Sequence, residues 1–268
     1  MVRAIDFCLP DVWSFDKNGR CIIKTLVWLL SGGLLLPCRF VIAETKERIN
    51  TMKPINKYID HTNLKPNATE ADIIRHCDEA KKNDFASVCI NPVNVRLAKK
   101  ELEGSDVKVC TVIGFPLGQN RTETKVFETE LALKDGCDEF DMVINVGALK
   151  SKKDDFVRED ISAVVKAASG KTVKVIIESG LLEDEEIARA ARLSCEAGAD
   201  FVKTCTGFGT GVATVHAVSV IKENLTGDVK IKASAGIKTY EDAKALIEAG
   251  AQRLGTSSGA AIMEGAVE

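Results

Sequence analysis

From Met52 onward, short apolar runs rich in β-branched residues alternate with stretches of helical periodicity. We predict eight strands, at residues 58–60, 86–90, 107–113, 139–145, 173–178, 200–204, 229–233 and 253–256. The clearest helices between them are 70–82, 122–135, 183–197 and 240–249, where apolar residues recur at intervals of three and four. Because the strands are nearly continuous in apolar residues and alternate with helices, they are typical of a parallel sheet buried on both faces.

The number of repeats predicts the architecture. Eight strand and helix units in one uninterrupted stretch fit an α/β fold of the (β/α)8 TIM-barrel type. A doubly wound open sheet stays as the alternative, because a count of strands does not prove that the sheet closes. We therefore expect one TIM-barrel domain over residues 52–268.

Residues 1–51 differ from the rest of the chain, since they hold both tryptophans and a leucine-rich run at 22–36. That run is shorter than the roughly 20 apolar residues that span a bilayer, so we expect no membrane helix. A signal peptide is an alternative, because residues 41–43 resemble a small-residue cleavage site. We favour a third interpretation, in which Met52 is the natural start and residues 1–51 are a leader or extra segment outside the fold.

Composition limits the partners. The net charge of −3 gives no basic field for nucleic acid, so none is expected as a partner. The nine cysteines are odd in number and contain no C-x-x-C pair, which favours reduced thiols in a cytoplasmic protein. With three histidines and none at metal-ligand spacing, we expect neither a metal centre nor a cofactor.

Two lysines stand out because they interrupt apolar strands. Lys203 ends the predicted strand 200–204 and Lys232 lies near the end of the next, 229–233. Neighbouring strands lie about 4.8 Å apart, so the two ammonium groups would be close, and like charges at that distance cannot both stay ionised cheaply. One lysine would then be a free amine that attacks a carbonyl, with Asp141 across the barrel mouth moving protons through a water.

Other polar residues also fall at predicted strand ends, which in a TIM barrel meet at the catalytic face. Besides Lys203, Lys232 and Asp141, they are Asp60, Asn145 and Glu178. For any one of these, a structural ion pair is the competing interpretation, but their gathering on one rim favours a site.

Small-residue loops on the same rim predict an anion site. Gly207 follows the strand with Lys203, Gly236 follows the strand with Lys232, and Gly255, Ser257 and Ser258 follow the last strand. Loops of this kind offer backbone N–H groups, and TIM barrels commonly bind phosphate between the last two of them. Ordinary turn chemistry is the alternative for either loop alone.

Eight motifs, in order, make the chain from Met52 to its end resemble the deoxyribose-phosphate aldolases. They are YIDHTNLKP (58–66), ASVCINP (86–92), VIGFPLG (112–118), DEFDMVIN (138–145), KVIIESGLL (174–182), FVKTCTGFG (201–209), KIKASAGIK (230–238) and LGTSSG (254–259). The resemblance implies a class I aldolase in which Lys203 forms the Schiff base, Lys232 keeps it deprotonated and assists proton transfer, and Asp141 relays protons.

The same resemblance implies a substrate-binding set, namely Asp60, Thr62, Cys89, Thr206, Gly207, Gly236, Gly255, Ser257 and Ser258. Two features depart from the family pattern. Ser179-Gly180 replaces a bulkier or threonine-containing pair, and the chain ends at Glu268 without the tyrosine-ending tail of some members. The leader has no counterpart in the family, and neither departure touches the lysine pair.

The implied reaction is reversible cleavage of 2-deoxy-D-ribose 5-phosphate to D-glyceraldehyde 3-phosphate and acetaldehyde, a step of nucleoside catabolism. The partners are therefore a small phosphosugar and an aldehyde, and the protein could assemble as a homodimer or homotetramer. The alternative is another TIM-barrel phosphosugar enzyme, either an aldolase of different specificity or an isomerase. An isomerase would use carboxylates and would need no lysine nucleophile. A non-catalytic sugar-phosphate sensor would have no use for two buried lysines.

Overall fold

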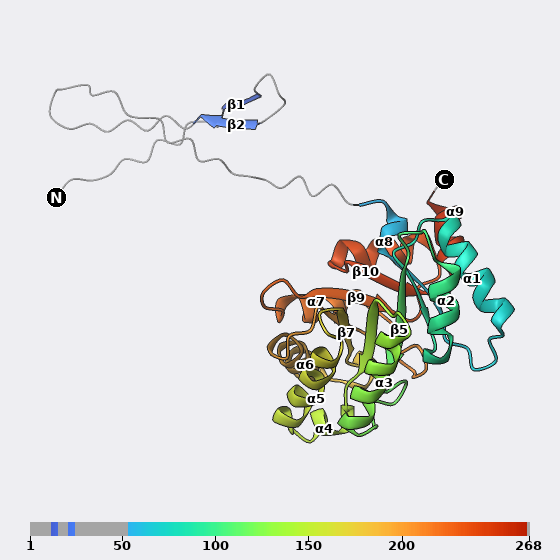
Figure 1. The fold of residues 1–268 in the computed structure, drawn as a ribbon. Helices are drawn as coiled ribbons and strands as arrows, with labels where there is room; N and C mark the ends of the chain where they lie inside the picture. The colour runs from blue at the N-terminus through green and yellow to red at the C-terminus, as the bar shows by residue number, and fades with distance from the viewer. Residues whose placement is uncertain (1–11, 16–20, 25–52, 267–268) are drawn as a thin grey trace, which may run out of the picture. The chain divides into compact units, whose positions relative to one another are not determined.

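The computed structural model describes residues 12–15, 21–24 and 53–266. Within residues 53–266, eight parallel strands close into a barrel in which each strand pairs with its neighbours in the sequence, and the last strand pairs with the first (Figure 1). The strands are β3 (Ile59–Asn63), β4 (Ser87–Ile90), β5 (Lys108–Ile113), β6 (Glu139–Val143), β7 (Thr172–Ile176), β8 (Phe201–Lys203), β9 (Lys230–Ser234) and β10 (Arg253–Thr256). Closure confirms the TIM barrel and rules out the doubly wound alternative.

Helices follow the strands and pack outside the barrel. The α-helices are α1 (Glu70–Lys82), α2 (Val95–Glu101), α3 (Thr122–Lys134), α4 (Val146–Lys150), α5 (Asp154–Ala167), α6 (Asp184–Glu196), α7 (Val215–Glu223), α8 (Tyr240–Ala249) and α9 (Gly259–Gly265). Short 3₁₀ helices lie at Ile55–Tyr58, Pro92–Asn94 and Ser179–Leu181. The four helices predicted from periodicity all exist, with ends within one residue of the prediction.

Strand ends were predicted less well than helix ends. The first strand was expected to end at Asp60, but β3 continues to Asn63 and Tyr58 belongs to the preceding 3₁₀ helix. Glu178 was expected to end the fifth predicted strand, 173–178, whereas β7 ends at Ile176 and Glu178 takes a left-handed conformation with φ 53°. Asn145 lies beyond β6 and caps α4 through a bond from the backbone of Ala148.

The two faces of each strand meet different surroundings because successive side chains point to opposite sides. In β6, Phe140 and Met142 join the large apolar core between strands and helices. The alternate residues Glu139 and Asp141 point into the barrel, where they are buried. The barrel interior is therefore unusually rich in charge, and its apolar content includes a small separate cluster that contains Cys89, Cys110 and Val112.

The segment before the barrel forms a unit of its own, Met1–Asn50, as against Thr51–Glu268. Its described residues are two antiparallel strands, β1 (Val12–Phe15) and β2 (Cys21–Lys24). Most of the leucine-rich run and the residues around Met52 lie outside the described residues, so the leader stays a prediction. Among the residues that the structure describes, no helix has the length and apolar content needed to cross a bilayer.

Candidate active site

Strand register brings the two predicted lysines together. Lys203 of β8 and Lys232 of β9 are direct partners in the parallel ladder. Both ammonium groups donate to the same oxygen, Oδ2 of Asp141, at 2.7 Å each. All three side chains are buried in the barrel. The structure therefore brings the three residues proposed as catalytic into one cluster. For the two lysines, this closeness was predicted because their strands are adjacent.

A third buried lysine, Lys174 of β7, completes this cluster and was missed in the sequence. Lys174 is the ladder partner of Asp141 and its Nζ lies 2.9 Å from Oδ1 of that carboxylate. The same Nζ lies 2.7 Å from Oε2 of Glu139 and 3.8 Å from Oδ2 of Asp60. A lysine inside the apolar run KVII was the available signal, by the same reasoning that singled out Lys203.

Asp60 lies lower in the barrel than predicted. It is the second residue of β3, level with the first residue of β4, and so is far from the carboxyl end of the strand. Its carboxylate accepts bonds from Ser87 Oγ at 2.7 Å and Arg253 Nε at 2.6 Å, and pairs with Lys232 at 2.6 Å. Asp60 thus lies on the amino-terminal side of the cluster and contacts it through Lys232. The prediction that Asp60 lies at the mouth of the barrel was wrong.

Counting the charges of this interior network shows why one lysine differs from the others. Three carboxylates face four basic groups: Asp60, Glu139 and Asp141 against Lys174, Lys203, Lys232 and Arg253. If all were ionised, the buried cluster would hold one excess positive charge, which is costly. Lys203 touches one carboxylate, whereas each of the other three basic groups touches at least two. Lys203 therefore has the fewest carboxylate partners of the four basic groups.

The partners of Lys203 are held in their ionised forms. Burial raises the pKa of Asp141, but the three surrounding lysines outweigh burial and hold it well below its usual range. Burial lowers the pKa of Lys232, but the carboxylates of Asp141 and Asp60 outweigh burial and raise it above its usual value. An ionised carboxylate and a cationic lysine thus lie beside Lys203.

Two thiols and a hydroxyl border the cluster. Cys110 donates to Oδ1 of Asp141 at 3.2 Å, and its ladder partner Cys89 is likewise buried in the barrel. A hydrogen bond from Cys110 lowers the pKa of Cys89, while burial raises the pKa of Cys110. Thr62, two residues above Asp60, is half-buried and bonds to the Asp60 carbonyl at 2.9 Å.

The loop after β8 is fixed by Glu178. One carboxylate oxygen of Glu178 accepts from Thr206 Oγ1 at 2.5 Å and from the Thr206 backbone at 3.2 Å. Gly207 follows with φ +81°, a conformation that strains other residues. Thr206 and Gly207 are thereby held at the carboxyl end of β8, next to Lys203.

The loops after β8, β9 and β10 lie against one another. Ala213 donates to the Ala235 carbonyl at 3.0 Å, and a side chain at Gly236 would meet the Val212 side chain at 2.9 Å. Thr256 donates to the carbonyl of Ile237 at 2.7 Å, which joins the loops after β9 and β10. The structure therefore brings the predicted phosphate loops side by side.

Gly255, Ser257 and Ser258 hold different positions at this rim. Gly255 lies within β10, where a Cβ would come within 3.1 Å of the Lys232 side chain, so glycine makes room for that lysine. Ser257 is exposed, and Ser258 immediately precedes α9. The backbone of Ser258 donates to Thr256 Oγ1 at 2.9 Å, which orders this turn.

A closed parallel barrel with lysines buried around an ionised carboxylate fits the architecture of a class I aldolase. The DeoC/LacD family aldolase model matches residues 55–265. The chain is 59% identical over 212 residues to the deoxyribose-phosphate aldolase of Clostridium novyi, covering 79% of this chain and 96% of that protein. The match to the deoxyribose-phosphate aldolase of Streptococcus sanguinis is 57% over 211 residues, with the same coverage. This chain belongs to the DeoC/LacD family of aldolases.

A solved structure agrees with this assignment. The tetrameric deoxyribose phosphate aldolase of Aeropyrum pernix superposes with a TM-score of 0.73 at 35% identity, and covers 78% of this chain and 89% of its own. The motifs predicted the family and the strand repeats predicted the barrel fold, and both predictions are confirmed. The roles of individual residues remain proposals.

Proposed function

We propose that this protein is a deoxyribose-phosphate aldolase that cleaves 2-deoxy-D-ribose 5-phosphate to D-glyceraldehyde 3-phosphate and acetaldehyde. The observation that carries the proposal is the pair of lysines on one oxygen of Asp141, with Lys203 touching the fewest carboxylates. Relatives above 55% identity carry that activity in their names.

Covalent chemistry starts at Lys203. Its free amine attacks the aldehyde carbon of the open-chain sugar, and loss of water leaves a protonated imine. A base removes the proton of the C3 hydroxyl, the C2–C3 bond breaks, and its electron pair moves toward the imine nitrogen to give an enamine. Glyceraldehyde 3-phosphate leaves. Protonation of the enamine carbon and hydrolysis of the imine then release acetaldehyde and restore Lys203.

The proton steps fall to Asp141 and Lys232. Asp141, held as a carboxylate, is suited to take the C3 hydroxyl proton through a water. Lys232, held as a cation 2.7 Å from the same carboxylate oxygen, is suited to return protons. An ionised base and a protonated acid are therefore available together at neutral pH.

The phosphate group would lie on the three joined loops, where Gly207, Gly236 and the turn at Ser257-Ser258 present small residues. Two successive residues, Ala235 and Gly236, have positive φ, a backbone conformation that small residues and glycine adopt most readily. Thr62, Cys89 and Thr206 would border the sugar between this loop cluster and Lys203.

An isomerase or an aldolase of different specificity is the competing function, and a direct assay separates them. Purified protein given 2-deoxy-D-ribose 5-phosphate should release acetaldehyde and glyceraldehyde 3-phosphate in equal amounts. Conversion to another pentose phosphate without acetaldehyde would establish an isomerase. Activity on other phosphosugars alone would establish a different aldolase.

We also propose that the enzyme works in the cytoplasm as a homo-oligomer. The six cysteines within residues 53–266 are free, including the adjacent pair Cys89 and Cys110, which suits a reducing compartment. Phe127 and Leu131 lie one turn apart on α3 with exposed fractions of 60% and 46%, an apolar surface that a second copy could cover. The Aeropyrum pernix relative is tetrameric.

A further inference from the structure

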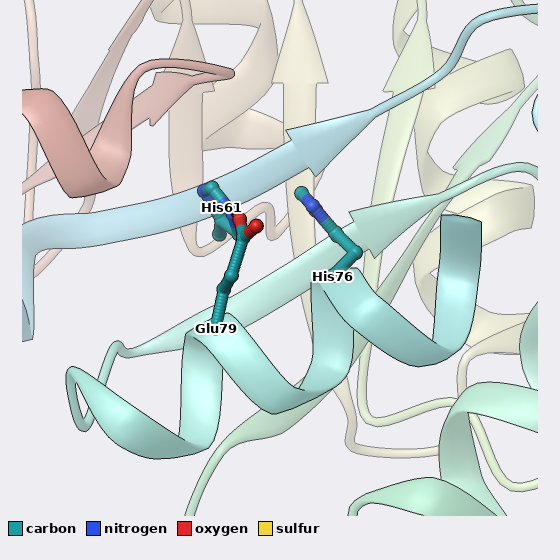
Figure 2. A group of neighbouring side chains, drawn as sticks. All are labelled: His61, His76 and Glu79. Carbon is teal, nitrogen blue, oxygen red and sulfur yellow. Dashed lines mark hydrogen bonds and ion pairs between the residues drawn. The ribbon is translucent and has the colours of Figure 1, made fainter. Parts of the chain in front are cut away.

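Two histidines and a glutamate gather outside the barrel, between β3 and α1. His61 comes from β3, and His76 and Glu79 come from the facing side of α1 (Figure 2). The two imidazole rings are stacked, with centroids 3.9 Å apart and an angle of 14° between their planes. Glu79 Oε2 lies 2.9 Å from Nε2 of His61. One ligand atom from each residue can be chosen so that all three lie within 4.8 Å of one another.

Both rings carry a nitrogen that is buried without a hydrogen-bond partner: Nδ1 of His61 and Nε2 of His76. Within the described residues, four other buried side-chain atoms share this property, and three of those form ion pairs. The two imidazole nitrogens have no such compensation, although their residues are 2% and 7% exposed. Unpartnered buried polar atoms are costly and often indicate an ion or water at the site.

Burial of the two rings disfavours their charged imidazolium forms. Burial lowers the pKa of His61 below its usual value, and burial together with the neighbouring His61 lowers the pKa of His76 to about 3. Nε2 of His61, 2.9 Å from Glu79 Oε2, is the atom of that ring that faces the carboxylate. Glu79, which is partly exposed, supplies a carboxylate and opens the cluster to solvent.

We propose that His61, His76 and Glu79 form a binding site for a divalent transition metal of the zinc type, separate from the catalytic cluster. Neutral imidazole and carboxylate are donors that Zn²⁺ accepts, and two histidines with one glutamate leave a fourth position for water. Ligand atoms about 2.0–2.1 Å from zinc lie about 3.3 Å apart in tetrahedral geometry, so binding tilts His76 out of the stack and draws the group together.

The site's expected effect is on stability. His61 lies on β3 between Asp60 and Thr62, but its side chain faces α1, outside the barrel. A bound metal would tie α1 to β3 without touching Lys203 or Asp141. Because the native arrangement of donors is lost on unfolding, metal binding should stabilise the folded state by mass action.

The test uses the full chain, freed of metal with a chelator, and then titrated with ZnCl₂ or CoCl₂. Zinc at a hundred times its dissociation constant should raise the thermal unfolding midpoint by about 5 to 10 °C. Cobalt should give visible absorption bands of a tetrahedral nitrogen and oxygen site. His76→Gln should abolish the shift and the bands, and Glu79→Gln should weaken affinity about 10- to 100-fold.

His216→Gln is the matched control, because His216 pairs with Asp184 at 2.8 Å on the surface and should leave binding unchanged. The other described three-residue group is Cys89, Cys110 and Asp141, where cobalt would give thiolate charge-transfer bands and zinc would stop catalysis. The proposal is overturned if zinc produces no shift, if the bands are those of a thiolate site, or if Glu79→Gln binds zinc as tightly as the unaltered chain. If His76→Gln does not fold, the zinc affinity of Glu79→Gln decides whether the proposal holds.

Discussion

Lys203 and Lys232 differ in what surrounds them, although they are the same residue type on adjacent strands. Lys232 lies 2.6 Å from Asp60 and 2.7 Å from Asp141, whereas Lys203 touches Asp141 alone. In a buried cluster with one more base than acid, this difference is the reason we propose Lys203 as the nucleophile and Lys232 as its cationic neighbour.

Lys232→Leu tests this assignment through the pH dependence of the rate. Loss of the cation removes repulsion of a protonated Lys203 and leaves two carboxylates less neutralised, so both changes favour protonated Lys203. The acid limb of the kcat/KM profile should move up by about 1 to 3 pH units. An unchanged acid limb in a folded variant would refute charge repulsion as the cause.

Lys232→Arg separates charge from proton transfer. Arginine keeps the positive charge but does not release a proton at these pH values. The acid limb should stay in place while kcat falls by about 10²-fold or more. Full turnover in this variant would remove Lys232 from the proton path.

Lys174→Met tests the lysine that the sequence did not reveal. Asp141 should lose part of the positive field that holds its pKa down, so the pH dependence of kcat should change as well as stability. Breaking a buried ion pair costs about 3–5 kcal/mol. Lys125→Met is the control, because Lys125 is equally buried, pairs with Asp160 at 2.5 Å and does not touch Asp141. It should lose stability without a change in the pH profile. Matching profiles in both variants would make Lys174 purely structural.

At the scale of elements, the three rim loops decide which sugars bind. Ser258→Asp places a negative charge at the start of α9, where the phosphate is proposed to lie. KM for 2-deoxy-D-ribose 5-phosphate should rise at least about tenfold, since like charges repel at short range. Turnover of unphosphorylated 2-deoxyribose should change little. Equal losses on both substrates would contradict a phosphate site there.

The burial of His76 between β3 and α1 predicts that the free energy of unfolding decreases at acid pH. His76 is neutral in the folded protein, with its pKa at about 3, and has an ordinary pKa of about 6.5 when unfolded. Above pH 6.5 the group has no effect. As pH falls from 6.5 toward 3, the unfolded chain binds the proton first, so the free energy of unfolding should drop by up to about 1.4 kcal/mol per pH unit.

Urea denaturation with chelator present, at pH values from 7 to 4, measures that slope. His76→Phe, which keeps an aromatic ring without a titrating nitrogen, should flatten it. An identical slope in both proteins would show that groups other than His76 cause the loss of stability at acid pH.

Helices proved easier to predict from sequence than the site. The ends of α1 and α8 matched because capping residues Thr69 and Thr239, each with an aspartate three residues later, fix them locally. The length of β3 depends on pairing with β4 and β10, which local sequence does not encode. Lys174 interrupts an apolar run and so carried a local signal, but its contact with Asp141, 33 residues away, depends on strand register.

At the scale of the whole molecule, the barrel unit from Thr51 to Glu268 carries the whole cluster of charged residues. A protein that starts at Met52 should therefore stay in solution, unfold cooperatively and keep full aldolase activity. Activity per mole and thermal unfolding, compared with the full chain, measure this. A marked loss of either would show that residues 1–51 contribute to the folded enzyme.

The account as a whole depends on Lys203 being the nucleophile, and chemical trapping tests that claim most directly. Incubation with acetaldehyde and sodium borohydride reduces the imine and leaves one ethyl group on the lysine that formed it. Peptide mass spectrometry should locate that group on Lys203, with Lys174 and Lys232 unlabelled. A label on either of those two lysines, or no label on a protein that still releases acetaldehyde from the phosphosugar, would contradict the account.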